Sequence, residues 1–239
     1  MTSIVVLDNK LHRGARVRAG QSDPAGRQRF VQVVLREFSQ LAIQHPIVVS
    51  KDSDTGAFFV GAMFGFDEGE NLFVGDGGAH EGYRPLNLQR APFYVSEGRL
   101  AVDMDSPLIS TGQGEALFDE EGKATPFLEN IHHVLGEFRT GLEMTRVFID
   151  TLLEHKLLVE MEVDLSFDDG TRRQLEGLYT IDQDGLRALD DAAVLELFRR
   201  GYMYLVHLMI VSVKQIAQLA RRKNERLLGP LPAASAGLV

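Results

Sequence analysis

Short apolar runs separated by turn residues fill the first half of the chain. The runs are rich in β-branched and aromatic residues and are bounded by Gly, Pro, Asn or Asp, which is the pattern of short β-strands. Short turns at residues 51–56 and at Glu97-Gly98 join two pairs of runs, so each pair is expected to form an antiparallel hairpin. The pattern predicts an antiparallel β meander with strands at residues 4–7, 46–50, 57–66, 72–74, 92–95 and 100–104.

One short helix interrupts the predicted strands. Phe38, Leu41 and Ala42 recur at helical spacing between Arg36 and Gln44. Pro46 ends this helix, because the residue before a proline disfavours the α conformation.

The period of the apolar residues changes at Thr125. A helical stripe of apolar residues continues from there to about Leu157, with Thr125 as the N-cap and Pro126 in the first turn. Gly136 and Gly141 lie inside this helix, where a missing side chain either kinks the helix or lets a neighbour approach closely. The pattern therefore predicts one long helix.

A second hairpin and further helices follow. Residues 160–167 and 172–181 alternate in β fashion across an Asp-Asp-Gly turn, which is a strong hairpin signal. Short helices are expected to start near residues 182 and 190, and a long helix is expected over residues 202–227.

The order of these elements indicates the fold class. Strands come first, and helices that enclose one more hairpin come second, so we predict an α+β fold rather than a doubly wound sheet. With 239 residues, 44% of them hydrophobic, the chain can bury a substantial core. We expect one compact domain over residues 1–228, and a flexible tail over the small, proline-bearing residues 229–239.

The charge balance argues against nucleic acid as a partner. The chain has 25 Lys and Arg residues against 34 Asp and Glu residues, a formal net charge of -9. The densest basic run, Arg221-Arg222-Lys223 with Arg226, closes a predicted helix, where cations suit the carbonyls of the last turn. A patch for nucleic acid or anionic lipid is the alternative interpretation of that run.

No cysteine occurs in the chain, which excludes disulfides, thiolate nucleophiles and cysteine-based metal sites. The N-terminal residues MTSIVVLDNKLHRG lack the positive and apolar segments of a Sec signal peptide. The apolar run Tyr202–Val213 is interrupted by His207 and ends at Lys214, short of the roughly 20 residues that span a bilayer. We therefore expect no transmembrane segment and a cytoplasmic location, with the cell surface, reached without a Sec signal, as the alternative.

Residues 65–86 combine six glycines, five acidic side chains and one histidine. A phosphate loop needs a lysine that this stretch lacks, a dinucleotide fingerprint needs a strand-to-helix turn, and an EF-hand needs a register that these acids do not keep. The glycines are expected to permit turns, with the acids in solvent and ligand capture as the alternative. The ligand-binding candidates here are Glu70, Asn71, Asp76, His80 and Arg84.

Asp103 and Asp105 are two further candidates. Residues two apart on a strand share a face, so these carboxylates are placed to hold a cation or to raise one another's pKa. The plainer alternative has Met104 facing the core and both aspartates facing water.

The chain has no motif for nucleophilic or metal catalysis. The sequences G-x-S-x-G, H-x-x-x-H and H-E-x-x-H are all absent. His132 and His133 are consecutive on the predicted helix and point about 100° apart, so they do not share one metal ion. We expect no metal and no cofactor. His207 is expected to be a core histidine, on a helix whose apolar surface packs on the helix over residues 126–157 or on a partner.

Several segments together resemble the SapC family of bacterial proteins. They run from near Ile4 to about Leu227 and include HPIVVSKDSDTGAFFVGAMFGFDEGENLF, YRPLNLQRAPF, DMDSPLIS, GEALFDEEGKATPFL, LLEHKLL, LEGLYTID, RRGY and RKNERL. The resemblance implies a surface-layer-associated namesake and genomic company with TonB-dependent receptors, flavin-dependent halogenase-like proteins and cupin-like hydroxylases. It implies an accessory role in nutrient uptake or modification, and it carries over no catalytic residue.

Three hypotheses about function stay open. The leading one is a non-catalytic accessory or binding protein that engages a protein, peptide or small ligand, with a homo-oligomer as a further option. The first rival is an enzyme in which Asp103, Asp105, Glu70, His80 and Arg84 converge in three dimensions. The second rival is a self-assembling surface-layer component.

Overall fold

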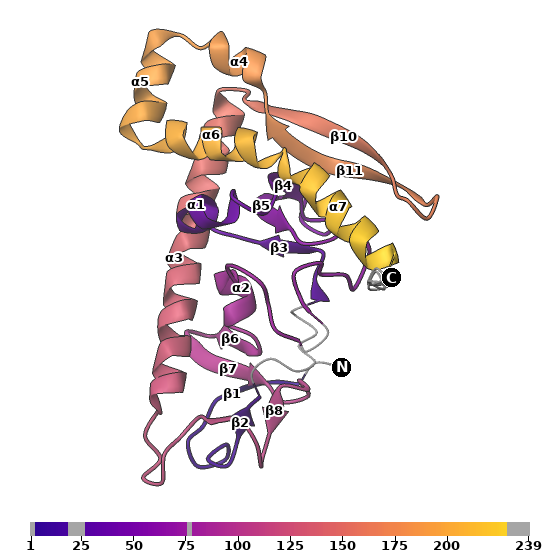
Figure 1. Ribbon diagram of the computed structural model, residues 1–239. Coiled ribbons are helices and arrows are strands. Elements are labelled where there is room, and N and C mark those ends of the chain that lie inside the picture. The colour runs from indigo at the N-terminus through magenta and orange to yellow at the C-terminus, as the bar shows by residue number, and fades with distance from the viewer. Residues whose placement is uncertain (1–2, 19–26, 76–77, 229–239) are drawn as a thin grey trace, which may run out of the picture.

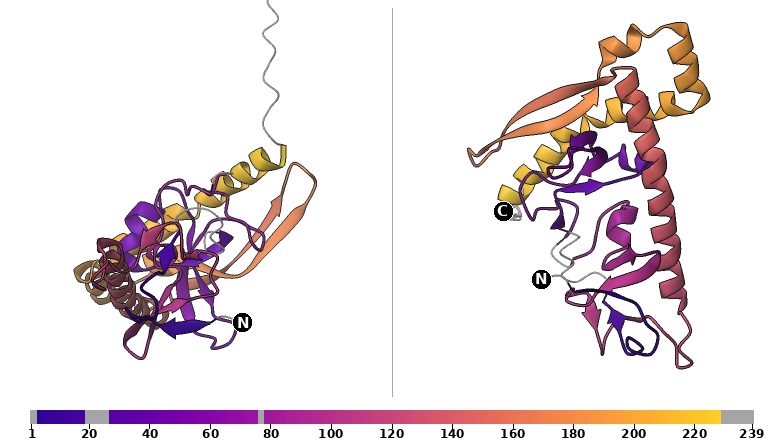
Figure 2. Two further views of the ribbon diagram at one scale, coloured as in Figure 1. Left: turned by 90° about the horizontal axis from the view of Figure 1, so that it is seen from below. Right: turned by 180° about the vertical axis from the view of Figure 1, so that it is seen from behind.

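The computed structural model describes residues 3–18, 27–75 and 78–228 (Figure 1). Helix α3, Pro126–Glu154, runs along one side of the molecule from its small sheets to its large sheet (Figures 1 and 2). Thr125 caps α3 by accepting a hydrogen bond from the N–H of Leu128 at 3.4 Å, and Pro126 occupies the first turn. Both predictions for the start of this helix are confirmed. The helix ends at Glu154 because Lys156 adopts a left-handed conformation, with φ of 54°.

The larger sheet joins strands from both halves of the chain. Its strands are β3 (Phe30–Gln32), β4 (Ile47–Lys51), β5 (Phe58–Met63), β10 (Leu158–Ser166) and β11 (Arg172–Ile181). They pair antiparallel in the order β10-β11-β4-β5-β3. The predicted hairpins β4–β5 and β10–β11 are confirmed, and Leu178 opposite Ser50 links one hairpin to the other.

Two smaller antiparallel sheets lie beside the N-terminal part of α3 (Figure 1). One has the order β1-β7-β6, and the other has the order β8-β2-β9. Their strands are β1 (Ile4–Val6), β2 (Arg16–Val17), β6 (Phe93–Ser96), β7 (Arg99–Asp103), β8 (Ile109–Ser110) and β9 (Glu115–Ala116). The predicted hairpin β6–β7 is confirmed. The strands of the predicted meander are thus divided among sheets, with β4 and β5 in the large sheet.

Among the described residues, seven further helical segments are shorter than α3, three of them between strands and four after the last strand, β11. They are η2 (Leu35–Glu37), α1 (Phe38–Leu41), α2 (Leu86–Gln89), α4 (Gln183–Arg187), α5 (Asp191–Arg199), α6 (Tyr202–Ser212) and α7 (Gln215–Leu228). Asp182 and Asp190 cap α4 and α5 as predicted. The helix predicted over residues 202–227 is divided into α6 and α7. The Ser212 hydroxyl donates to the carbonyl of Met209 at 2.7 Å, a back-bond that bends helices, and a turn follows.

The predicted strand at residues 72–74 is wrong. Of these residues, Val74 alone makes a β contact, an isolated bridge with His80. The side-chain oxygen of Asn71 accepts the N–H of Phe73 at 2.9 Å and so removes the amide that a ladder would use. The segment is a folded loop.

Helix α3 contributes to three clusters of buried apolar side chains. Phe148, Ile149 and Leu152 belong to the main core with the large sheet, α6 and α7. Leu128, Ile131 and Leu135 belong to the core beneath the small sheets. A small cluster lies between them and consists of Val34, Leu86, Val134 and Phe138. The overall class is α+β, as predicted.

The two glycines inside α3 differ in the space that is available for a side chain. A Cβ at Gly141 would lie 2.7–2.9 Å from side-chain atoms of the fully buried Val34, so the predicted close approach is confirmed there. A Cβ at Gly136 would meet nothing within 4 Å.

We therefore expect Gly136→Ala to stabilise the protein by about 0.5–1 kcal/mol, because alanine loses less backbone entropy in a helix. Gly141→Ala is expected to destabilise it by about 1–3 kcal/mol through overpacking. Thermal and urea unfolding of the two variants measure the difference. An equal effect of both substitutions would contradict the assigned packing.

Candidate functional site

Glu70, a predicted ligand-binding residue, bonds to the backbone of its own loop and to helix α7. One carboxylate oxygen, Oε2, accepts the N–H of Phe66 at 2.8 Å, and the other contacts the ammonium group of Lys223 on α7. Lys223 is only 9% exposed and also donates to Asp67 at 2.7 Å. Hydrogen bonds from Lys223 and then from Arg173 hold the pKa of Asp67 below its usual value. These charges fasten α7 to the loop.

Two further basic side chains of residues 221–226 also bind this loop. Arg226 donates to the carbonyls of Asn71 at 3.1 Å and Val74 at 2.7 Å. Arg222 pairs with Glu81 at 2.9 Å. Three of the four cations in this run therefore bind the chain's own loop.

The other candidates of this stretch lie in the same region. Asn71 is 4% exposed, and Arg84 donates to the carbonyl of Leu88 at 3.0 Å. Asp76 lies outside the described residues. His80 is half-buried, and neither of its ring nitrogens has a hydrogen-bond partner among the described residues.

Helix α6 differs from its sequence prediction at His207. This histidine was expected in the core, yet it is exposed. Its Nδ1 lies 2.7 Å from the carbonyl of Met203, so the imidazole is engaged with its own helix. By length and composition, Tyr202–Leu228 is long and apolar enough to cross a membrane, a test that core helices of soluble proteins also pass. Val206 and Met209 of this segment lie in the main core.

Asp103 and Asp105 lie apart from that group, in the region of the small sheets. Strand β7 ends at Asp103, and its Oδ1 accepts the N–H of Asp105 at 3.1 Å. Asp105 therefore belongs to the turn that follows the strand, and the two carboxylates do not share one strand face. Met104 packs against the second core, as the plainer alternative has it.

A buried histidine, His45, was missed by the sequence analysis. It is fully buried between Phe64 and Phe73, with both ring centroids 4.1 Å away. Its Nδ1 lies 3.1 Å from the carbonyl of Met63, and Nε2 has no hydrogen-bond partner in the part of the chain that the structure describes. Burial lowers the pKa of His45 to about 4. Burial, and next the charge of Arg84, lower the pKa of His80. In the sequence, His45 directly precedes Pro46, and this dipeptide was interpreted only as the end of a helix, so the burial of His45 was not predicted.

The depressed pKa of His45 predicts a loss of stability in acid. The unfolded chain binds a proton near pH 6.5 and the folded chain only near pH 4, so stability is complete above pH 6.5 and falls as the pH drops to about 4. The loss amounts to roughly 3 kcal/mol. Urea unfolding across this range should give a shallower pH dependence for His45→Asn than for the natural protein. Equal slopes would contradict the assigned neutral imidazole.

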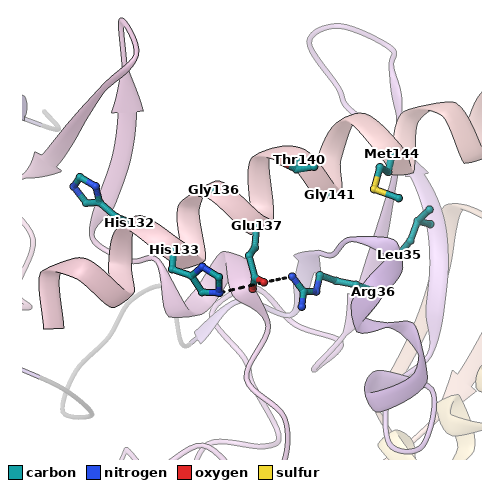
Figure 3. Close-up of a pocket in the computed structure, with 9 residues that line it drawn as sticks. All are labelled: Leu35, Arg36, His132, His133, Gly136, Glu137, Thr140, Gly141 and Met144. Atoms are coloured by element: carbon teal, nitrogen blue, oxygen red, sulfur yellow. Dashed lines mark ion pairs between the residues drawn. The ribbon is translucent and has the colours of Figure 1, made fainter. Parts of the chain in front are cut away.

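A groove of about 520 Å³ lies along α3 (Figure 3). Helix α3 supplies one wall and the floor, from His132 to Met144, and η2 supplies the other wall with Leu35 and Arg36. Gly136 leaves the floor open, because no side chain stands there. His132 and His133 point away from each other, as expected for consecutive helical residues (Figure 3).

Three charged or polar groups meet at one end of the groove (Figure 3). Glu137 Oε1 contacts the guanidinium of Arg36, and it lies 3.2 Å from Nε2 of His133. The side chain of Glu137 is 23% exposed, so its carboxylate is partly open to solvent. Arg36 is 57% exposed, so it has further N–H donors open to solvent. Met144, which is 58% exposed, gives the other end an apolar surface.

The buried carboxylate of Glu37 positions the η2 wall. Its Oε2 accepts the N–H of Val34 at 2.9 Å, and its Oε1 accepts the N–H of Leu86 at 2.7 Å and the hydroxyl of Tyr83 at 3.2 Å. Burial raises the pKa of Glu37, and these hydrogen bonds oppose that rise. The Thr145 hydroxyl accepts the N–H of Leu35 at 3.2 Å and joins the wall to α3.

Glu37→Ala is expected to lower the free energy of unfolding by about 3 kcal/mol or more, because it leaves two buried N–H groups and the half-buried hydroxyl of Tyr83 without an acceptor. Glu37→Gln is expected to cost less, since the amide oxygen keeps part of that role. Urea denaturation measures both.

The matched control is Glu68→Ala, which removes a carboxylate that is 93% exposed and is expected to change stability by at most about 0.5 kcal/mol. A loss for Glu37→Ala no larger than for Glu68→Ala would refute the role of Glu37.

Fold and groove together define an α+β protein with a solvent-accessible groove beside a long helix. The chain belongs to the SapC family, whose family model, described as SapC, matches residues 7–219. The resemblance seen in the sequence is thereby confirmed. No curated protein and no solved structure matches the chain.

Proposed function

We propose that this SapC-family protein is an accessory binding protein, without bond-breaking chemistry of its own, that takes a polypeptide segment in the α3 groove. The observation that carries the proposal is the pair formed by Arg36 and Glu137 beside the open floor at Gly136. The guanidinium offers N–H donors, and the partly exposed carboxylate of Glu137 offers acceptor lone pairs. A peptide group presents the matching carbonyl and N–H side by side.

The dimensions of the groove favour an extended segment. From His133 to Met144 the α3 face covers twelve residues, and the eleven rises between them extend about 16 Å along the helix axis. That length accommodates about five residues of extended chain. The polar end supports recognition of the main chain, and the apolar end at Leu35 and Met144 supports recognition of one apolar side chain.

The proposal is tested by photo-cross-linking in the native host. A benzophenone amino acid at Thr140, on the groove floor, should capture a protein partner, while the same group at the exposed Glu176 on β11 should not. Gly136→Leu should abolish the cross-link by filling the groove. A Cβ at Gly136 meets no atom within 4 Å, so this variant should stay folded.

Gly136→Ala serves as the matched control, because one methyl group leaves most of the groove open, and it should retain the cross-link. An undiminished cross-link with Gly136→Leu would refute the groove as the binding site. Cross-links only to other copies of the chain would favour the surface-layer component instead.

A further inference from the structure

The hairpin β10–β11 separates from the rest of the large sheet near Gly177. Strand β11 pairs with β4 at Leu178 and Tyr179, and the pairing stops before Gly177. Gly177 has a φ of 69°, and the register of β10 against β11 shifts at this place, which marks a β-bulge. A bulge bends the strand that carries it, so residues 172–176 of β11 diverge from β4.

The tip of the hairpin is fixed again on the loop that follows β5. Arg173 donates a hydrogen bond to Asp67 at 2.6 Å. The rings of Phe167 and Phe66 lie 5.4 Å apart. The hairpin is therefore held to β4 at one end and to this loop at the other.

A pocket of about 320 Å³ adjoins the diverging part of β11. Its volume lies at the small end of the range of ligand pockets, roughly 300–1,000 Å³. Residues of β3, β4, β5 and β11 contribute to its lining. The apolar part of the lining is well buried, since Met63, Leu175 and Leu178 are 4%, 7% and 9% exposed. The pocket therefore suits a small ligand that has an apolar group.

The pocket meets the edge of β11 and not one of its faces. Gln174, Leu175 and Glu176 all line it, although successive side chains of a strand point to opposite faces. On the side away from β10, the backbone of residues 172–176 has no backbone hydrogen-bond partner among the described residues. Unpaired N–H and C=O groups at a strand edge bind the main chain of a peptide.

The pocket contains one side chain of each charge. Of the nine residues that line it, Arg29 and Glu176 are ionised at neutral pH, and they come from segments on either side of β4 and β5. Arg29 donates to the carbonyl of Phe66 at 3.1 Å and pairs with Glu68 at 3.3 Å, so other N–H groups of its guanidinium are still available. Glu176 is exposed and has no hydrogen bond or ion pair within the described part of the chain.

We propose that this pocket binds a free dipeptide with apolar side chains. An extended dipeptide carries an ammonium group and a carboxylate roughly 7 Å apart, which pair with Glu176 and Arg29. Its peptide group bonds to the open edge of β11, and an apolar side chain packs on Met63 and Leu178. A free amino acid lacks the peptide group, and a longer peptide separates the two charges further.

Isothermal titration calorimetry of the full chain with L-leucyl-L-leucine tests the proposal. We expect saturable binding of one dipeptide per chain. The N-acetyl dipeptide lacks the ammonium group and the dipeptide amide lacks the carboxylate, so each should bind about tenfold more weakly or worse. Free L-leucine should also bind at least about tenfold more weakly, because it has no peptide group.

Glu176→Gln should weaken binding of the free dipeptide about tenfold and bring its affinity to that of the N-acetyl form. Glu162→Gln is the matched control, because it removes the same charge from an exposed residue of β10 that does not line the pocket. It should bind the dipeptide like the natural protein. Gly136→Leu should do so too, since the pocket shares no residue with the α3 groove.

Three results would overturn the proposal. They are an absence of saturable binding to the natural protein, equal affinities for the free and the N-acetyl dipeptide, and a loss with Glu162→Gln as large as with Glu176→Gln.

Discussion

The α3 groove depends on one buried carboxylate. Glu37 is fully buried in a three-residue helical turn, where an ionised group is costly unless every oxygen is well bonded. Three donors meet it, two of them from residues more than forty positions further along the chain. By holding Val34 and Leu86 together, Glu37 ties the η2 wall to the segment that leads into α2. The small cluster with Val134 and Phe138 then fixes that wall against α3.

Local patterns predicted most of the individual elements. Alternation around tight turns identified the three hairpins, and the cap at Thr125 identified the start of α3. The division of strands among sheets was not predictable, because the pairing of Leu178 with Ser50 joins residues 128 positions apart and leaves no periodic signal. The short strands β2, β8 and β9, of two residues each, are likewise below what alternation can reveal.

The sequence identified side chains whose chemistry suits ligand binding, but it did not show which contacts these side chains make within the fold. Glu70 carries the right chemistry for ligand binding, but Lys223 lies 153 residues further on and neutralises it within the fold. The groove was missed because its Arg36 and Glu137 come from distant segments whose contact only the tertiary structure creates. Gly136 was a residue of the groove whose position in the sequence was unusual. A glycine inside a strong helix costs stability, and here it leaves the floor of the groove open.

Helix α3 has a consequence for how the molecule comes apart. Its side chains from Leu128 to Leu152 take part in all three apolar clusters, so neither the large sheet nor the small sheets keep a complete core once this helix melts. One helix serves both ends, so unfolding that starts at one end of α3 and spreads along its backbone hydrogen bonds would expose the buried apolar side chains of the other end. The two ends of the molecule are therefore expected to unfold together, with the central amides of α3 among the slowest to exchange with solvent.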